Sequence, residues 1–335
     1  MKALQYLYDN HRLLHKDLIV VFNDAAGCYD RIRPNQAELC RRRLGGNVNV
    51  LRTRTKIQNN MKHYVRTSVG VSKSYIEWGE TEEDEEITTR KEDDVTIING
   101  NLGGEGQGGG ASPIMWLVVL IVMINTFNVF TQGAVVTDPL TMKELAISVL
   151  SYVDDNSIVK SLESNIPVEE SFKIMAKDMS IWQRILQTTG GDLAVHKCTV
   201  SIMKWKWGEA TGVPQLTTKN DESGTIEIDV MQNGNATTIA LKRLEVWESE
   251  KQLGILLPID GSFKQEYERR LKMSEDLGKK MYSAPLNAYE SVLMYRLYYC
   301  PKISFPLSIT QFTRTECNKI RFRANFTDMH YLRWA

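Results

Sequence analysis

The sequence predicts an α+β protein whose core is an antiparallel sheet in a βαββαβ arrangement. Three observations lead to this prediction. Short apolar runs typical of buried strands recur along the chain, segments typical of helices separate them, and two of the strands meet at a tight turn. Strands joined by a tight turn reverse direction, so the sheet is expected to be antiparallel.

The first part of the chain supplies a helix, a strand and a second helix. Residues 1–15 have a loosely apolar side, and residues 17–22 are a continuous apolar run of strand length. Pro34 stands where the first turn of a helix tolerates proline, and Gly45-Gly46 ends that helix. The buried strand and the helix after it begin the predicted core.

An inserted segment follows at residues 46–105. Its residues 64–100 alternate like hairpin strands, and the acidic run from Glu77 to Asp94 is expected to be their exposed tip. That run holds 10 Asp and Glu against two bases, Arg90 and Lys91. Because like charges repel, a solvated tip is a more natural role for it than a binding site.

The second part of the chain completes the core. After the glycine-rich residues 103–110, an apolar helix begins near Ser112, and strands at 146–153 and 156–162 meet at the turn. The later elements are a helix at 167–188, a strand at 193–207, a polar hairpin within 208–241, a strand at 253–257 and helices from 262. The helix at 167–188 has apolar residues at three- and four-residue spacing, which predicts one buried face: Phe172, Met175, Met179, Trp182 and Leu186.

Composition excludes several classes of protein. With 335 residues, 42% hydrophobic and 24% charged, the chain can bury a sizeable core and is not a disordered tail. Its five cysteines include no Cys-x-x-Cys pair, which argues against a zinc ribbon or a disulfide scaffold. The longest apolar run, 114–124, has 11 residues, whereas a membrane span needs roughly 18, and the N-terminus lacks the apolar stretch of a signal peptide. We therefore expect an intracellular protein, nuclear or cytoplasmic, that is not secreted and binds no membrane.

The net charge of zero conceals two regions of opposite sign. Outside residues 77–94, 39 Lys and Arg stand against 31 Asp and Glu, a balance of +8. The residues from Asp260 onward hold 13 bases and eight acids. Partners that carry phosphate are therefore compatible with the sequence.

Three carboxylates are the strongest candidates for chemistry. Asp154 and Asp155 adjoin at the turn of an apolar hairpin, and Asp24 follows the buried strand at 17–22. Asp is also a common turn residue, so the adjacent pair alone is a moderate signal. If the strands end at one level, the three carboxylates come together and can hold two Mg²⁺ ions, with Mn²⁺ as an alternative. Two such ions stabilise the attacking and leaving oxygens of phosphoryl transfer.

Five blocks in this order resemble reverse transcriptases of the non-LTR retrotransposon and group II intron-like type, over about residues 17–260. Asp24 to Asp30 is similar to the first metal motif of that family, and Tyr152-Val-Asp-Asp155 is similar to the second. The other blocks are a glycine–glutamine block at 106–113, a block ending in a lysine at 190–197 and a primer-grip strand at 252–255.

The resemblance implies a role for each matched side chain. Asp24, Asp154 and Asp155 would be metal ligands and catalytic carboxylates, and Lys197 would be a general acid for the pyrophosphate leaving group, with a surface lysine as the plainer alternative. The residues that would contact the nucleotide are Tyr29, as a gate against the ribose 2′-OH, and Gly106, Gln107 and Gly108. A core tyrosine and a glycine linker are the plainer alternatives for these four.

The resemblance also implies a right-hand polymerase palm of ferredoxin-like βαββαβ type, with partial fingers and a helical thumb. The implied division is residues 1–45 for the start of the palm, 46–105 for the fingers-like insertion, 106–258 for the rest of the palm and 259–335 for the partial thumb. Only about 20 residues precede the first metal motif, so we expect a truncated retroelement protein.

The expected function is RNA-directed DNA synthesis, in which dNTPs are added to a primer 3′-OH. The implied partners are an RNA template, a DNA primer and product, and dNTPs. Two alternatives stay open, an RNA-directed RNA polymerase, against which Tyr29 argues, and a non-catalytic palm that binds RNA or a protein partner.

Overall fold

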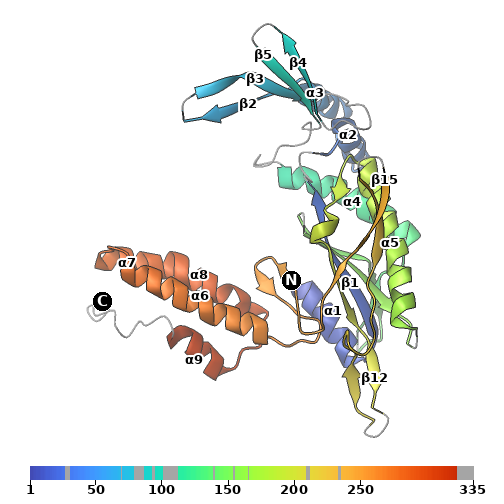
Figure 1. The fold of residues 1–335 in the computed structure, drawn as a ribbon, viewed down its shortest axis with the longest axis vertical. Coiled ribbons are helices and arrows are strands. Elements are labelled where there is room, and N and C mark those ends of the chain that lie inside the picture. Colours follow the sequence, from blue (N-terminus) through green and yellow to red (C-terminus); the bar gives the residue numbers. More distant parts are fainter. Residues whose placement is uncertain are drawn as a thin grey trace. The chain divides into compact units, whose positions relative to one another are not determined.

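The structure is a computed structural model that describes residues 1–26, 31–68, 70–78, 87–92, 95–100, 112–138, 140–153, 155–164, 166–208, 212–232 and 235–322. It divides into two compact units (Figure 1). One unit contains residues 16–204 and 219–243, and the other contains residues 1–15, 205–218 and 244–335. The four-part division of the chain expected from the sequence stays a prediction.

The larger unit is built on a central sheet with the strand order β16-β11-β1-β9-β8, and β10 pairs with β1. All pairs are antiparallel except β11 with β16. The strands are β1 (Asp17–Ala26), β8 (Val149–Tyr152), β9 (Asp155–Leu162), β10 (Asp192–Leu193), β11 (Thr199–Met203) and β16 (Lys242–Arg243). The predicted α+β class with an antiparallel sheet is therefore confirmed.

Two long helices bury one face of this sheet (Figure 1). They are α4 (Ser112–Phe130), between β1 and β8 in the chain, and α5 (Val168–Thr188), between β9 and β11. The five apolar residues predicted to form the buried face of α5 are all in the core. The two helices meet edge to face at Phe127 and Trp182, whose ring centroids lie 5.4 Å apart. Alternate residues of β1, such as Ile19 and Val21, point into the same core because side chains alternate across a strand.

Among the described residues, α4 is the helix long and apolar enough to cross a membrane by length and composition, with a mean hydropathy of 2.1. The apolar run at 114–124 is shorter than this helix, because uncharged residues extend α4 to Phe130. Part of α4 packs in the protein core through Trp116, Val119, Leu120, Met123 and Phe127.

The inserted segment contains a helix that the sequence analysis did not identify, and a four-stranded sheet. The helix α3 (Val48–Asn59) begins at Asn47, whose side chain accepts hydrogen bonds from the backbone N–H groups of Asn49 and Val50. The sheet has the order β2-β3-β5-β4, formed by β2 (Lys62–Thr67), β3 (Gly70–Trp78), β4 (Ile87–Glu92) and β5 (Val95–Gly100). The predicted acidic tip is thus wrong in part, because Glu77 lies in β3 and residues 87–92 form β4. Residues 79–86, 93 and 94 lie outside the described residues.

The remaining elements of the larger unit are α2 (Pro34–Arg43) and two hairpins. The hairpins are β6 (Ala134–Thr137) with β7 (Glu144–Ile147), and β14 (Glu227–Gln232) with β15 (Asn235–Ala240). The strand expected at 193–207 is divided into β10, a short helix η1 (Val195–Lys197), β11 and β12.

The smaller unit is mainly helical after residue 263. Its strands form two hairpins, β12 (Trp205–Trp207) with β13 (Pro214–Leu216), and β17 (Lys251–Gln252) with β18 (Ile255–Leu256). Its helical segments are α1 (Lys2–Leu13), α6 (Lys264–Ser283), α7 (Ala288–Met294), η2 (Tyr295–Tyr299), α8 (Cys300–Ser304), η3 (Phe305–Ser308) and α9 (Arg314–Phe322).

Candidate functional site

The register of β1 against β9 places two of the predicted carboxylates opposite each other. Asp24, near the end of β1, is the cross-strand partner of Asp155, the first residue of β9. Directly opposed residues in an antiparallel pair share a face of the sheet, with Cβ atoms roughly 4.5–5.5 Å apart. Asp155 is exposed and Asp24 is partly exposed, so both carboxylates are accessible to solvent. In this register, the end of β1 and the start of β9 lie at one level, as predicted for Asp24 and Asp155.

Lys197 is the third charged group at this place. Its Nζ lies 2.8 Å from Oδ2 of Asp24, and the two side chains are 60% and 35% exposed. The backbone explains this position, because Ala194 N–H donates to the Asp24 carbonyl at 2.9 Å and β10 pairs with the end of β1. The turn of η1 then carries Lys197 back to the carboxylate of Asp24. Lys197 was predicted to face a leaving group, and here it forms an ion pair with a predicted metal ligand.

A glycine holds the segment before Lys197 in place. Gly190 has a left-handed backbone, with φ of +94°, and a Cβ atom at this position would lie 2.4 Å from the Arg31 carbonyl oxygen. No L-residue with a side chain fits such a position without movement of the backbone. A hydrogen bond stabilises this close approach of the two backbone segments, since Arg33 N–H donates to the Thr189 carbonyl at 2.9 Å. The block at 190–197 is therefore tied to the chain that follows the first metal motif.

The turn between β8 and β9 has a strained backbone at Val153 and is stabilised by a hydrogen bond from α4. Val153 has φ of +60°, a left-handed conformation that is unusual for a β-branched residue. The indole Nε1–H of the fully buried Trp116 donates to the Val153 carbonyl. Trp116 thus couples α4 to the turn that carries the second motif. This role of Trp116 was not predicted, because a tryptophan inside an apolar helix is its one signal in the sequence.

Cys198 lies beside Lys197 in the chain but is not available as a nucleophile. Its side chain is buried, and its thiol Sγ donates to the Ala194 carbonyl at 3.6 Å. Burial raises the pKa of the Cys198 thiol to about 11, so the reactive thiolate is scarce at neutral pH. The chemistry of this site therefore depends on the carboxylates and Lys197.

Five predicted site residues lie outside the described residues, namely Tyr29, Gly106, Gln107, Gly108 and Asp154. Within the described ranges, no group of three or more His, Cys, Asp or Glu side chains is arranged to hold a metal ion. Asp24 and Asp155 supply two carboxylates of the kind that Mg²⁺ prefers, and Asp154 adjoins Asp155 in the chain. The Lys197 ammonium pairs with one of these two carboxylates, Asp24.

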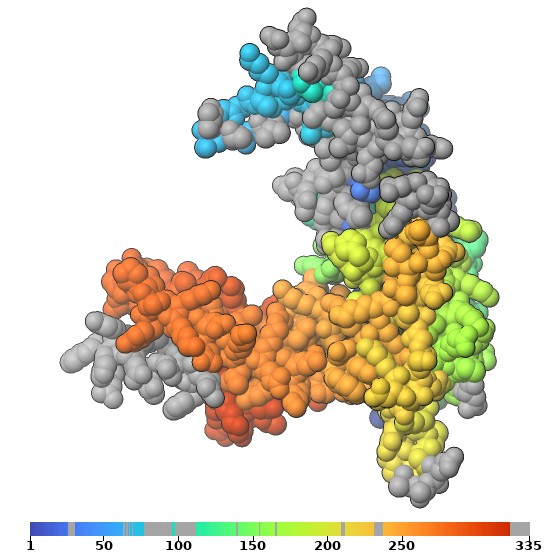
Figure 2. Space-filling view, in the orientation of Figure 1, coloured from blue at the N-terminus to red at the C-terminus, as the bar shows by residue number. Residues whose placement is uncertain are grey.

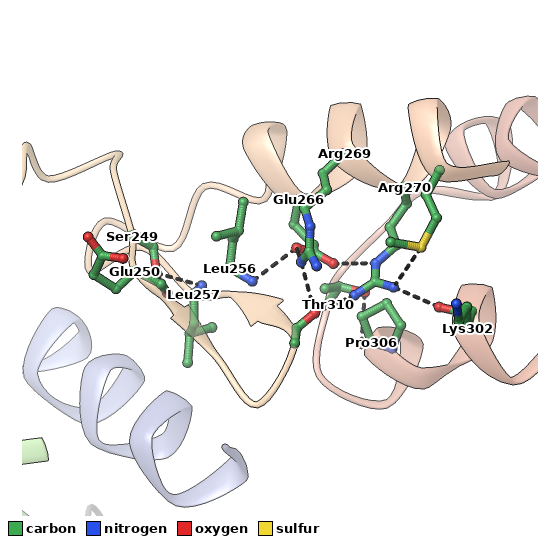
Figure 3. Close-up of polar contacts among 12 residues, drawn as sticks. Ser249, Glu250, Leu256, Leu257, Glu266, Arg269, Arg270, Lys302, Pro306 and Thr310 are labelled. Atoms are coloured by element: carbon green, nitrogen blue, oxygen red, sulfur yellow. Dashed lines mark hydrogen bonds and ion pairs between the residues drawn. The ribbon is translucent and has the colours of Figure 1, made fainter. Parts of the chain in front are cut away.

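The segment that resembles a primer-grip strand belongs to the smaller unit, where β17 and β18 form a hairpin. Its turn residues Leu253 and Gly254 both have left-handed backbones. Side chains of α6 hold the hairpin by its backbone (Figure 3): Glu266 accepts from Leu256 N–H at 2.9 Å, and Arg270 donates to the Gly254 carbonyl at 2.7 Å. The ion pair of Glu266 with Arg270 is almost completely buried, since the two side chains are 0% and 4% exposed.

No protein-family model and no curated protein matches the chain. Among solved structures, the chain is similar to telomerase from Candida tropicalis in complex with the TWJ fragment of telomeric RNA, with a TM-score of 0.41 and 13% identity over 96% of this chain and 44% of that one. It is also similar to telomerase from Candida albicans in complex with the TWJ fragment of telomeric RNA, with a TM-score of 0.33 and 13% identity over 99% of this chain and 46% of that one. The chain spans less than half the length of these two structures.

Proposed function

We propose that this chain is a reverse-transcriptase-like palm that extends a primer 3′-OH with dNTPs on an RNA template. The observation that carries the proposal is the cross-strand pair of Asp24 and Asp155, with Lys197 beside it. Phosphoryl transfer needs little covalent chemistry from a protein, so its residues mainly position and stabilise charge. Opposed carboxylates at the end of a rigid antiparallel sheet suit that task.

Asp24, Asp154 and Asp155 are the residues that would hold two Mg²⁺ ions, with Mn²⁺ as a substitute. Their oxygens match the preference of Mg²⁺, and a cation beside them offsets the repulsion between adjacent carboxylates. Bound Mg²⁺ supplies positive charge that stabilises the attacking and leaving oxygens. The strained turn supported by Trp116 would hold Asp155 in a fixed orientation for this purpose.

Lys197 would donate a proton to the pyrophosphate that leaves when the primer oxygen bonds to the α-phosphorus. Its long and exposed side chain can reach beyond Asp24 once a metal ion occupies the carboxylates. Tyr29 would reject the ribose 2′-OH, and Gly106, Gln107 and Gly108 would contact the nucleotide. These assignments follow from the resemblance to the family, as do a retroelement origin, a nuclear or cytoplasmic location, and the fingers and thumb.

Primer extension on an RNA template tests the proposal. The full chain is assayed with dNTPs or NTPs, in Mg²⁺ or Mn²⁺, beside Asp24→Asn and Asp154→Asn. We expect extension with dNTPs by the wild type and a loss of at least about 100-fold in both variants, since each would remove a charged ligand for the metal ions. Asp229→Asn, at an exposed position of β14, is the matched control and should be unaffected. Extension that survives Asp24→Asn contradicts the proposed mechanism.

The Asp24–Lys197 ion pair favours a second candidate, a palm that binds RNA without catalysis. Lys197 neutralises Asp24, so it offsets the repulsion between the neighbouring carboxylates without a metal ion. Binding of RNA with no extension in either metal would support this alternative. Extension with NTPs that equals extension with dNTPs would instead indicate an RNA-directed RNA polymerase, and Tyr29→Ala tests the sugar gate.

A further inference from the structure

Two neighbouring tyrosines lie at the β2 edge of the sheet in the inserted segment. Tyr64 on β2 and Tyr75 on β3 are cross-strand partners, and their ring centroids lie 5.4 Å apart with an angle of 47° between the planes. Tyr64 is 48% exposed, whereas Tyr75 is less exposed and pairs on its other side with the buried Ile97 of β5. Tyr75 therefore anchors the pair to the sheet and Tyr64 presents an aromatic ring to solvent. In Figure 2, atoms of β2 and β3 form part of the molecular surface.

Exposed cations lie on the same two strands as these rings. The ammonium of Lys62 lies 4.2 Å from the centroid of the Tyr75 ring and donates to the Tyr75 hydroxyl at 3.0 Å. Lys62 is two residues from Tyr64 in the regular part of β2, so these two side chains share a face. The register of β2 against β3 shifts between Tyr64 and Arg66, and Arg66 on β2 and Lys73 on β3 lie at this irregularity, each two residues from a tyrosine of the pair. All three cations are exposed, and Glu77 is the cross-strand partner of Lys62.

The positive charge of the inserted segment is local to β2 and β3. These two strands hold three bases, Lys62, Arg66 and Lys73, against one acid, Glu77, whereas residues 48–100 as a whole hold eight Lys and Arg and ten Asp and Glu. Exposed aromatic rings set among cations are the features by which proteins bind single-stranded nucleic acid, because every base has a stacking face and every phosphate a negative charge. In a duplex the bases are already stacked on one another, and an acidic peptide has no base to stack on the exposed Tyr64 ring.

We propose that this face of β2 and β3 is a binding site for single-stranded nucleic acid, in which a base stacks on Tyr64 while Lys62, Arg66 and Lys73 contact phosphates. The site goes beyond the proposed polymerase function, because it uses none of the carboxylates and needs neither metal nor nucleotide. The inserted segment would thus bind unpaired nucleotides. A catalytic and a non-catalytic palm could both use such a site.

Binding of a fluorescein-labelled single-stranded RNA of about 12 nucleotides tests the proposal. Anisotropy is measured with the full chain in EDTA, without nucleotides. We expect Tyr64→Ala to weaken binding about five- to tenfold because the stacking ring is lost, and Tyr64→Phe to bind like the wild type. Arg66→Ala should weaken binding about fivefold and lower the slope of log affinity against log salt by about one, as loss of a phosphate contact does. Lys173→Ala is the matched control, because Lys173 is an exposed lysine on α5 that pairs with Glu169.

A crosslink gives a second readout that does not depend on other contacts of the strand. Irradiation of a bound strand that contains 4-thiouridine should attach it to the peptide that spans residues 62–75, and circular dichroism establishes that each variant is folded. Four outcomes would overturn the proposal: Tyr64→Ala binds like the wild type, Tyr64→Phe binds as weakly as Tyr64→Ala, a duplex of equal length binds more tightly, or an acidic peptide displaces the strand while the crosslink maps elsewhere. Binding and crosslinking are read in EDTA without nucleotides, where no extension occurs, so failure of the polymerase proposal is seen separately.

Discussion

The ion pair of Asp24 with Lys197 would compete with a metal ion for the Asp24 carboxylate. Their ion pair is partly exposed, and such pairs contribute only about 0.2–1 kcal/mol to stability. A bound divalent ion has more charge and several ligands, so it can displace the lysine at a small cost. Under the proposed function, Lys197 would then be available as the proton donor.

Removal of Lys197 should therefore strengthen metal binding. We expect Lys197→Ala to raise the affinity for Mn²⁺ roughly three- to fivefold, because the competing ammonium is gone. Electron paramagnetic resonance titration of free Mn²⁺ measures the change, and Lys173→Ala on α5 controls for a general change in charge. An unchanged or weaker affinity would show that the lysine does not compete for Asp24.

Cys198 makes the stability of the protein depend on pH above 9. Burial raises the pKa of its thiol to about 11 from an ordinary value of 9.0, so the folded state favours the protonated form. The unfolded chain releases this proton first as pH rises, so the contribution is complete below pH 9 and is lost by about pH 11. Between those values the wild type should lose on the order of 2–3 kcal/mol more than Cys198→Ser. Urea unfolding at several pH values measures the difference, and parallel curves for the two proteins would refute the burial argument.

At the scale of elements, the β17–β18 hairpin depends on α6 rather than on its own four-residue ladder. Glu266 and Arg270 bind the backbone of the hairpin, and Arg270 also donates to the Lys302 carbonyl at 2.6 Å (Figure 3). One buried ion pair thus ties together the hairpin, α6 and α8. A buried pair of this kind is sensitive to the loss of one partner, because the other charge stays buried without compensation.

Loss of Glu266 alone should be far more damaging than loss of an exposed acid on the same helix. We expect Glu266→Ala to destabilise the protein by about 3–5 kcal/mol. Glu275→Ala, which breaks the exposed pair with Lys279, should cost less than about 0.5 kcal/mol. Differential scanning calorimetry compares the two variants. The double variant with Glu266→Leu and Arg270→Met should recover much of the loss, and a double variant less stable than Glu266→Ala would contradict this account.

At the scale of the whole molecule, zero net charge results from the separation of acids and bases along the chain. Residues 80–86 hold six of the acids, whereas strands β2, β3, β4 and β5 hold five Lys and Arg against two acids. Charges interact over roughly 8 Å at physiological salt, so these acids can weaken the attraction of phosphate only where they lie near the basic residues of β2 and β3.

Neutralising the six acids tests this arrangement. Replacement of Glu80, Glu82, Glu83, Asp84, Glu85 and Glu86 by their amides changes the net charge from 0 to +6. We expect the affinity for single-stranded RNA to be unchanged or a few-fold higher at 0.05 M salt, with any gain disappearing at 0.5 M salt. Anisotropy at both salt concentrations measures it. A tenfold fall in affinity in a folded variant would show that the acidic run takes part in binding.

Local pattern in the sequence was sufficient for several elements of the fold. The apolar run after Asp17 predicts β1, and the three- and four-residue spacing in α5 predicts its buried face. Of the two strands predicted to meet at the turn, the one at 156–162 is found as β9, whereas the one at 146–153 is divided between β7 and β8. The helix α3 was missed because Val and Thr, which are weak helix formers, alternate with polar residues in it, and its start depends on the cap at Asn47.

The sequence by itself determined the α+β class and predicted which carboxylates are candidates for metal binding, because both follow from residue type and short-range periodicity. Only the tertiary structure decided that Asp24 faces Asp155, that Lys197 pairs with Asp24, and that Trp116 supports the turn at Val153. It also grouped residues 1–15 with the C-terminal helices and set Tyr64 beside Tyr75. These contacts join residues far apart in the chain or depend on strand register. Register and strand order are decided by the packing of the whole sheet, which no local pattern contains.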